Sequence, residues 1–139
     1  MNFDIPQDLQ NYLNELDLFI ENTIKPLENE DDNIRFFDHR REDARTDWER
    51  GGLPNEEWEA LLAKAKRLAD DAGHYRYPLP KEYGGQEGPN LEIAIIREHC
   101  ATLGLGLHNY LQNEQSIVVK NAGLLVMIDY CTHAEKSTW

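Results

Sequence analysis

Histidines, carboxylates and serines are the residues of this chain that could carry chemistry, and their spacing forms no familiar catalytic set. None of the five histidines lies in a His-Glu-x-x-His or Glu-x-x-His pattern, the spacings that place metal ligands on one helix face. Asp71 and His74 are three residues apart, but Gly73 interrupts the helix between them. Ser116 and Ser137 lack the Gly-x-Ser-x-Gly frame of a hydrolase nucleophile. We therefore predict no catalytic residue and no metal site, and we expect the histidines to have structural or surface roles.

Two glutamates stand out because they fall within segments of helical periodicity. Glu98 lies in register with the apolar residues of its segment, and Glu114 lies in the middle of the next one. A buried carboxylate without a partner is costly, so we expect each to meet a base, with Arg76 and Arg97 as candidates for Glu98. A structural ion pair is favoured over an acid–base role. No glycine-rich loop follows a strand, so the sequence offers no phosphate-binding cradle.

Composition and charge narrow the class of protein. The chain has 139 residues, 40% of them hydrophobic, and a net charge of −12. Residues 1–59 contain 17 acidic and 6 basic side chains, a surface that repels nucleic acid and anionic lipid. No apolar run approaches the ~18 residues needed to span a membrane. We expect a soluble intracellular protein, cytoplasmic by default, with a mitochondrial or peroxisomal address left open. Cys100 and Cys131 are expected to be small core residues in a reducing compartment.

The elements that must position these residues are predicted to be helical in the first half of the chain. From Leu9 to Ile24 apolar residues recur at three- and four-residue steps, beginning after Pro6 and ending at Pro26. The charged run 38–47 predicts a helix that continues to Arg50, with ion pairs between neighbouring turns. No β-hairpin signal is present.

The second half follows the same pattern. The clearest helix begins at Pro54 and ends before Gly73, a left-handed terminator. The proline- and glycine-rich segment 74–89 predicts a rigid loop. Asn90 is expected to cap a helix that Gly104 ends, and further helices are predicted over about 107–120, 124–130 and after Thr132. The sequence therefore predicts one all-α domain over 1–139, with about six helices packed as an orthogonal or up-down bundle.

The last residues bear on the extent of the protein. Thr132 and Glu135 have the spacing of a capping box, and only one helical turn follows before Trp139. A single turn is unstable in water, and an uncovered tryptophan exposes a large aromatic surface. We therefore expect this chain to be the front part of a longer protein.

The segment 65–98 carries a family resemblance. Ala72-Gly73, Pro80, Tyr83-Gly84-Gly85 and Glu98 occur in an order and spacing that resembles the N-terminal helical domain of the acyl-CoA dehydrogenases. Residues 130–139 are similar to the family's turn that follows an apolar helix, although Cys131 stands where glycine is usual. The run 36–42 fits a microbial branch of the family.

This resemblance implies a flavoenzyme, because the family oxidises the Cα–Cβ bond of an acyl-CoA with FAD. A following β-domain and C-terminal helical bundle supply most flavin contacts and the catalytic base, so this chain alone is expected neither to catalyse the reaction nor to bind FAD stably. Its implied partners are the acyl-CoA substrate and the missing C-terminal domains, and the oligomeric state stays open. The resemblance assigns one wall of the acyl pocket to the segment 107–120, with the candidates Tyr110, Leu111, Glu114 and Val118.

Two alternatives accompany this interpretation. The wall candidates could equally be ordinary packing residues. The chain could also be a stand-alone acidic helical module that binds another protein, through its acidic first half or the apolar face of its last helices.

Overall fold

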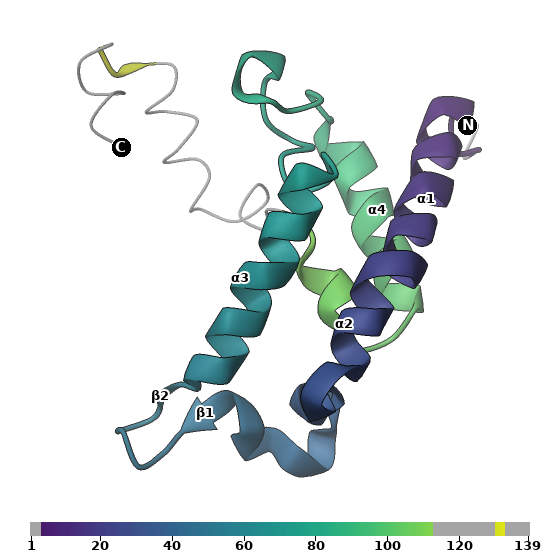
Figure 1. The fold of residues 1–139 in the computed structure, drawn as a ribbon. Coiled ribbons are helices and arrows are strands. Elements are labelled where there is room, and N and C mark those ends of the chain that lie inside the picture. The colour runs from purple at the N-terminus through teal and green to yellow at the C-terminus, as the bar shows by residue number, and fades with distance from the viewer. Residues whose placement is uncertain (1–3, 113–129, 133–139) are drawn as a thin grey trace.

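The computed structural model of the chain describes residues 4–112 and 130–132. Three long helical segments dominate this part (Figure 1). The first is a rod in which α1 (Gln7–Phe19), the π-helical turn η1 (Ile20–Ile24) and α2 (Lys25–Asn29) follow one another without a break. The other two are α3 (Glu56–Asp71) and α4 (Asn90–Thr102). The all-α prediction is therefore confirmed at the level of class. The described residues do not form the predicted six-helix bundle, and the helices predicted over 124–130 and after Thr132 fall almost wholly outside these residues.

The first rod continues past Pro26, where the sequence predicted its end. Proline lacks an N–H and its ring clashes with the carbonyl four residues earlier. Here the turn before Pro26 widens to π spacing, and the N–H of Lys25 donates to the carbonyl of Ile20. The widened turn lets the rod pass the proline. The predicted apolar stripe is confirmed, since Leu9 and Ile24 and the stripe residues between them are buried, with Phe19 partly so.

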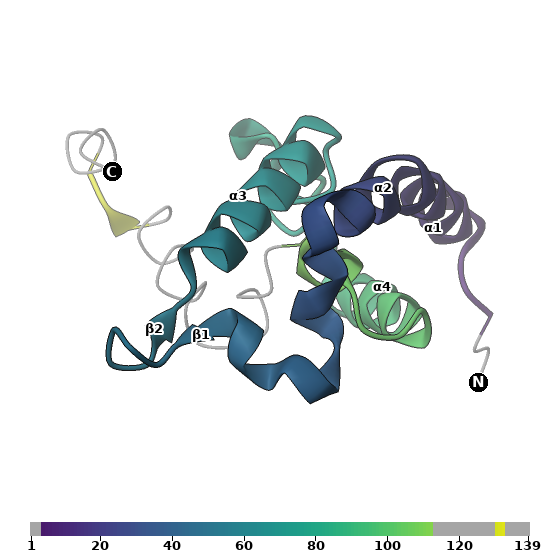
Figure 2. The same ribbon diagram turned by 60° about the horizontal axis from the view of Figure 1, so that its bottom comes forward.

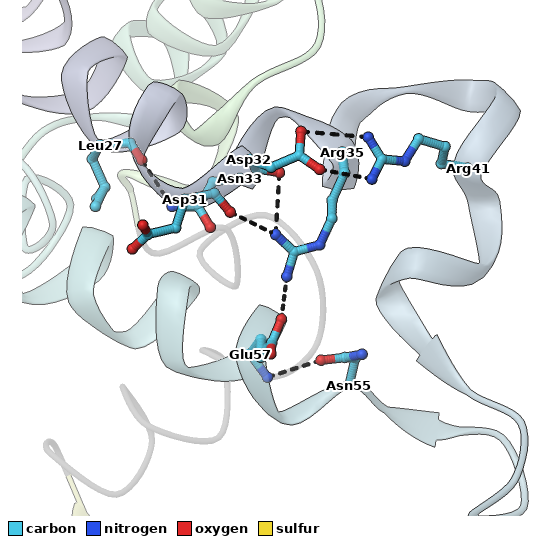
Figure 3. Close-up of polar contacts among 8 residues, drawn as sticks. All are labelled: Leu27, Asp31, Asp32, Asn33, Arg35, Arg41, Asn55 and Glu57. Carbon is cyan, nitrogen blue, oxygen red and sulfur yellow. Dashed lines mark hydrogen bonds and ion pairs between the residues drawn. The ribbon is translucent and has the colours of Figure 1, made fainter.

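A polar corner reverses the chain after the rod (Figure 3). In the 3-10 segment η2 (Glu30–Phe37), Asp31 and Asp32 have φ values of 47° and 59°. Aspartate tolerates this left-handed region better than most residues. Arg35 donates to both of their carbonyls at 3.1 Å and also pairs with Glu57 at the start of α3. The corner is therefore fastened to the helix that follows.

The segment predicted as a helix to Arg50 is instead a second 3-10 segment and a short hairpin. η3 (His39–Arg45) leads into β1 (Thr46–Asp47), which pairs with β2 (Leu53–Pro54) in antiparallel register. Gly51 and Gly52 turn the chain with φ values near 80°. The expected ion pairs along a helix are replaced by a longer connection, in which Arg41 pairs with Asp32 at 2.8 Å. The hairpin was missed because alternation over two-residue strands is too short to detect.

Helix α3 begins at Glu56 rather than Pro54, and Asn55 caps it, since the Asn55 side chain accepts a hydrogen bond from the N–H of Glu57. Its predicted buried face is confirmed at Trp58, Leu61, Ala65 and Ala69. Gly73 follows with φ of 83°, as expected.

The loop 74–89 folds back on itself and contains one 3-10 turn, η4 (Lys81–Tyr83). Gly84 adopts φ of 79°, and a Cβ on Gly85 would lie 1.9 Å from the carbonyl oxygen of Leu79. Only glycine fits at this close approach. Pro89 rather than Asn90 occupies the N-cap of α4.

The core lies where the three helical segments meet. α4 runs beside α1 in both views (Figures 1 and 2), and Ile93, Ile96 and Cys100 form its buried face. The short 3-10 helix η5 (Leu107–Tyr110) follows α4 and contacts the rod, α3 and α4. The helix predicted over 107–120 is therefore replaced at its start by this single turn, and the rest of that range lies outside the described residues. Within the part of the chain that the structure describes, no helix is long and apolar enough to cross a membrane.

We expect Gly85→Ala to lower the free energy of unfolding by about 3 kcal/mol, the upper end of the usual cost of overpacking, because the new methyl group meets a backbone carbonyl. Urea denaturation followed by circular dichroism measures this. Glu82→Ala changes an exposed residue of the same loop and should shift stability by no more than about 0.5 kcal/mol. Equal stability of both variants would contradict the close packing at Gly85.

Candidate functional site

An aromatic cluster centred on Trp58 brings η2, η3, α3 and η5 together. The indole ring lies 5.3 Å from the ring of Phe36, 5.8 Å from that of Phe37 and 5.5 Å from that of Tyr110, measured between centroids. The Arg45 guanidinium stacks over the same indole at 4.4 Å. Edge-to-face and cation–π geometries of this kind are favourable. The cluster therefore fixes Tyr110 and Arg45 relative to one another.

An open cleft lies against this cluster, between the aromatic residues and the loop that follows α4. It has a volume of about 400 Å³ and is lined by Phe37, Ala101, Leu105 and Tyr110 among others. Leu105 is 72% exposed although it is a large apolar residue. Small-molecule sites typically have volumes of ~300–1,000 Å³ and mainly apolar walls. This cleft is the candidate functional site.

The structure describes two of the four predicted wall residues and places one of them in this cleft. Tyr110 lines the cleft, and its hydroxyl accepts a hydrogen bond from Arg45 at 3.1 Å. Leu111 is 1% exposed and belongs to the core. Glu114 and Val118 lie outside the described residues. The sequence did not single out Phe37, Arg45 or Leu105 as site residues, because no periodicity links three positions so far apart.

Glu98 does not occupy the place expected from the sequence. It is exposed on α4, because the buried face of that helix passes through Ile93, Ile96 and Cys100. Arg76, one of its two proposed partners, pairs with Asp70 at 2.6 Å instead. Glu98 does line a second cavity of about 360 Å³, together with Arg97, His108, Gln112 and other residues.

The buried carboxylate of this fold is Glu28, which sequence reasoning missed because it lies in an acidic stretch. Its Oε1 accepts the backbone N–H of Leu107 and lies 3.9 Å from Nδ1 of His108. A Cβ on Gly106 would lie 2.6 Å from this oxygen, so the approach requires glycine. Glu28 therefore ties α2 to η5.

Glu28 and His108 form a desolvated acid–base pair. Nε2 of His108 lies 3.1 Å from the carbonyl oxygen of Gly104 and 3.2 Å from the side-chain nitrogen of Asn109. Nδ1 is buried and has no hydrogen-bond partner among the described residues. Burial raises the pKa of Glu28, although the Leu107 N–H and His108 act in the opposite direction.

Two further histidines have structural partners, as predicted. His74 is buried, with Nδ1 3.2 Å from the hydroxyl of Tyr12, and burial lowers the pKa of the imidazole. His99 lies 2.7 Å from Asp17 and joins α4 to α1.

Cys100 is buried as expected, and burial raises the pKa of its thiol to about 11, whereas Cys131 is only half-buried. Among the described residues no group of three histidine, cysteine or acidic side chains could hold a metal ion.

Comparison with known proteins gives no family assignment. No protein-family model, curated protein or solved structure matches the chain. The resemblance to the acyl-CoA dehydrogenases therefore stays a prediction from the motif residues.

We expect the free energy of unfolding of Glu28→Gln to increase relative to that of the native protein as the pH rises from 4 to 7. Because the folded pKa of Glu28 lies above its unfolded value, its favourable contribution is complete below the unfolded pKa and is lost as the pH rises through the folded pKa. Glutamine keeps the acceptor for Leu107 without the charge. Urea denaturation at several pH values measures the difference, and Glu82→Gln, at an exposed position, is the control. A difference that stays constant or reverses would contradict the raised pKa.

Proposed function

We propose that this chain is the N-terminal helical domain of an FAD-dependent acyl-CoA dehydrogenase and that it supplies one wall of the acyl pocket. The observation that supports this most directly is the cleft against Tyr110. Its apolar wall is open, and Tyr110, one of the four residues that the resemblance assigns to the acyl wall, lies in it. Leu111, the next residue along the chain, is buried in the core.

The motif residues also have local conformations that suit such a scaffold. Ala72-Gly73 ends α3 with a left-handed glycine, and Gly84-Gly85 closes the loop through a left-handed turn and a close backbone approach. These positions are where glycine is physically required. The resemblance therefore involves positions at which other residues would be strained.

In the intact enzyme the chemistry would lie in the following domains, as in the family. FAD would accept a hydride from Cβ, and a base supplied by those domains would remove the α-proton. The role of this chain would be to hold the acyl chain in place and to exclude water from it. Tyr110 would contribute through its ring face and Leu105 through its exposed side chain.

A protein-interaction module is the second candidate, and one observation favours it. Two large apolar side chains flank the hairpin turn, with Trp48 67% exposed and Leu53 52% exposed. Paired exposed apolar residues beside an acidic surface suit a contact with another protein. In the dehydrogenase proposal the same residues would face the following domains.

Sequencing the gene beyond the codon for Trp139 separates these candidates. A reading frame that continues into a β-domain and a second helical bundle agrees with the dehydrogenase. A stop codon directly after Trp139, together with a soluble protein that binds no flavin, would overturn the dehydrogenase proposal and favour the protein-interaction module.

With the full reading frame expressed, we expect a yellow protein that reduces a dye when octanoyl-CoA is added. Tyr110→Ala should raise KM for octanoyl-CoA about tenfold, since it removes apolar contact from the acyl wall. Tyr110→Phe keeps the ring and should leave KM within about twofold of the native value. An unchanged KM in both variants would remove Tyr110 from the pocket.

A further inference from the structure

The cleft against Tyr110 holds a feature that an acyl wall does not require, a fixed positive charge. Arg45 lines the cleft beside Leu105 and Ala101. Its guanidinium stacks over Trp58 at 4.4 Å and lies 5.1 Å from the centroid of Phe37. It donates to the carbonyl of Phe36 and to the hydroxyl of Tyr110. Stacking and hydrogen bonds together hold the charge in one orientation.

Both acceptors of Arg45 are neutral oxygens. In the part of the chain that the structure describes, no carboxylate lies within ion-pair distance of Arg45, whereas five other arginines pair with one: Arg35, Arg40, Arg41, Arg50 and Arg76. The contrast matters because the whole chain carries a net charge of −12 and acidic partners are abundant. Among the described residues, Arg45 is therefore a cation held beside an apolar cleft without a neutralising acid.

We propose that this cleft binds an alkyl carboxylate, with the carboxylate on Arg45 and the alkyl chain along Ala101 and Leu105. A guanidinium matches the two oxygens of a carboxylate with parallel N–H donors. A single cation suits a single negative charge, whereas phosphate-rich ligands need several cations and would be repelled by the acidic surface. The apolar lining accommodates the chain by removing it from water.

The carboxylate could come from two sources. One is a free fatty acid, and the other is the distal carboxylate of an acyl thioester derived from a dicarboxylic acid. The second source rests on the proposed function, because it makes the ligand a dehydrogenase substrate. The first source does not rest on it.

The test uses the purified chain, with isothermal titration calorimetry of octanoate, 1-octanol and octyltrimethylammonium. These ligands share an eight-carbon chain and differ in charge. We expect octanoate to bind at least about tenfold more tightly than 1-octanol, and octyltrimethylammonium to bind no more tightly than 1-octanol. Equal affinities for octanoate and 1-octanol, or no binding of octanoate, would overturn the proposal.

Variants then assign the charge to Arg45. Arg45→Gln should lower octanoate affinity about tenfold while 1-octanol affinity stays within about twofold. The control is Arg40→Gln, which changes an exposed arginine of η3 that already pairs with Asp38. It should leave octanoate binding unchanged. Equal losses in the two variants would show a general charge effect and would overturn the assignment.

A second variant covers the case in which Arg45→Gln does not fold. Leu105 is 72% exposed, so Leu105→Glu should preserve the fold and add a negative charge to the cleft. It should weaken octanoate binding about tenfold or more, and Leu105→Gln, without the charge, should weaken it less. Octanoate affinity that Leu105→Glu leaves unchanged would overturn the proposal.

The two sources are distinguished with short thioesters that lack the charges of coenzyme A. If S-suberyl-N-acetylcysteamine binds about tenfold more tightly than S-octanoyl-N-acetylcysteamine, the distal carboxylate of a thioester fits the cleft. If only octanoate binds, the free fatty acid is the ligand. Octanoate binding by a protein that proves not to be a flavoenzyme would leave this inference standing and remove the dehydrogenase. Dye reduction without any carboxylate preference would do the reverse.

Discussion

The indole ring of Trp58 is the contact on which the arrangement of the other segments depends. Phe36 and Phe37 from one side of the chain reversal, Tyr110 from the turn after α4, and the Arg45 guanidinium all lie against it. A desolvated cation–π contact contributes about 2 kcal/mol and an exposed one about 0.5–1 kcal/mol. Trp58 is 7% exposed, whereas Arg45 lines an open cleft, so the stacked pair is only partly removed from water. Side chains of η2, η3 and η5 all contact α3 through this one indole ring.

The polar corner before Phe36 serves the same arrangement through electrostatics. Asp31 and Asp32 hold left-handed conformations, which cost about 1–3 kcal/mol each when the surrounding structure does not compensate. Arg35 uses its guanidinium on their carbonyls and stacks over the ring of Phe36 at 4.2 Å. In the same corner Asp32 pairs with Arg41 and Glu30 pairs with Lys64, so two of its acidic side chains have cationic partners.

The sequence was most informative where a feature repeats over several turns. The apolar stripe from Leu9 to Ile24, the buried face of α3 and the left-handed Gly73 were all predictable, because periodicity and glycine conformation are local properties. Passage of the rod through Pro26 was not, since it depends on a widened π turn that leaves no pattern in the residues. The charged run after Asp38 was misread as helix because charge spacing alone does not distinguish a helix face from a chain of contacts reaching back to Asp32.

The candidate site was predictable only through Tyr110, because its other members are joined by tertiary contacts. Arg45 and Glu28 approach the same turn η5 from opposite ends of the chain reversal, and they respond to burial in different ways. Glu28 can lose its charge by binding a proton, and burial raises its pKa in that direction. Arginine cannot do so, since its guanidinium stays protonated in proteins. Arg45 must keep its charge, and the two neutral acceptors and the aromatic faces around it stabilise that charge without cancelling it. A positive charge without an acidic partner, beside an apolar surface, favours a ligand that combines a negative charge with an apolar chain.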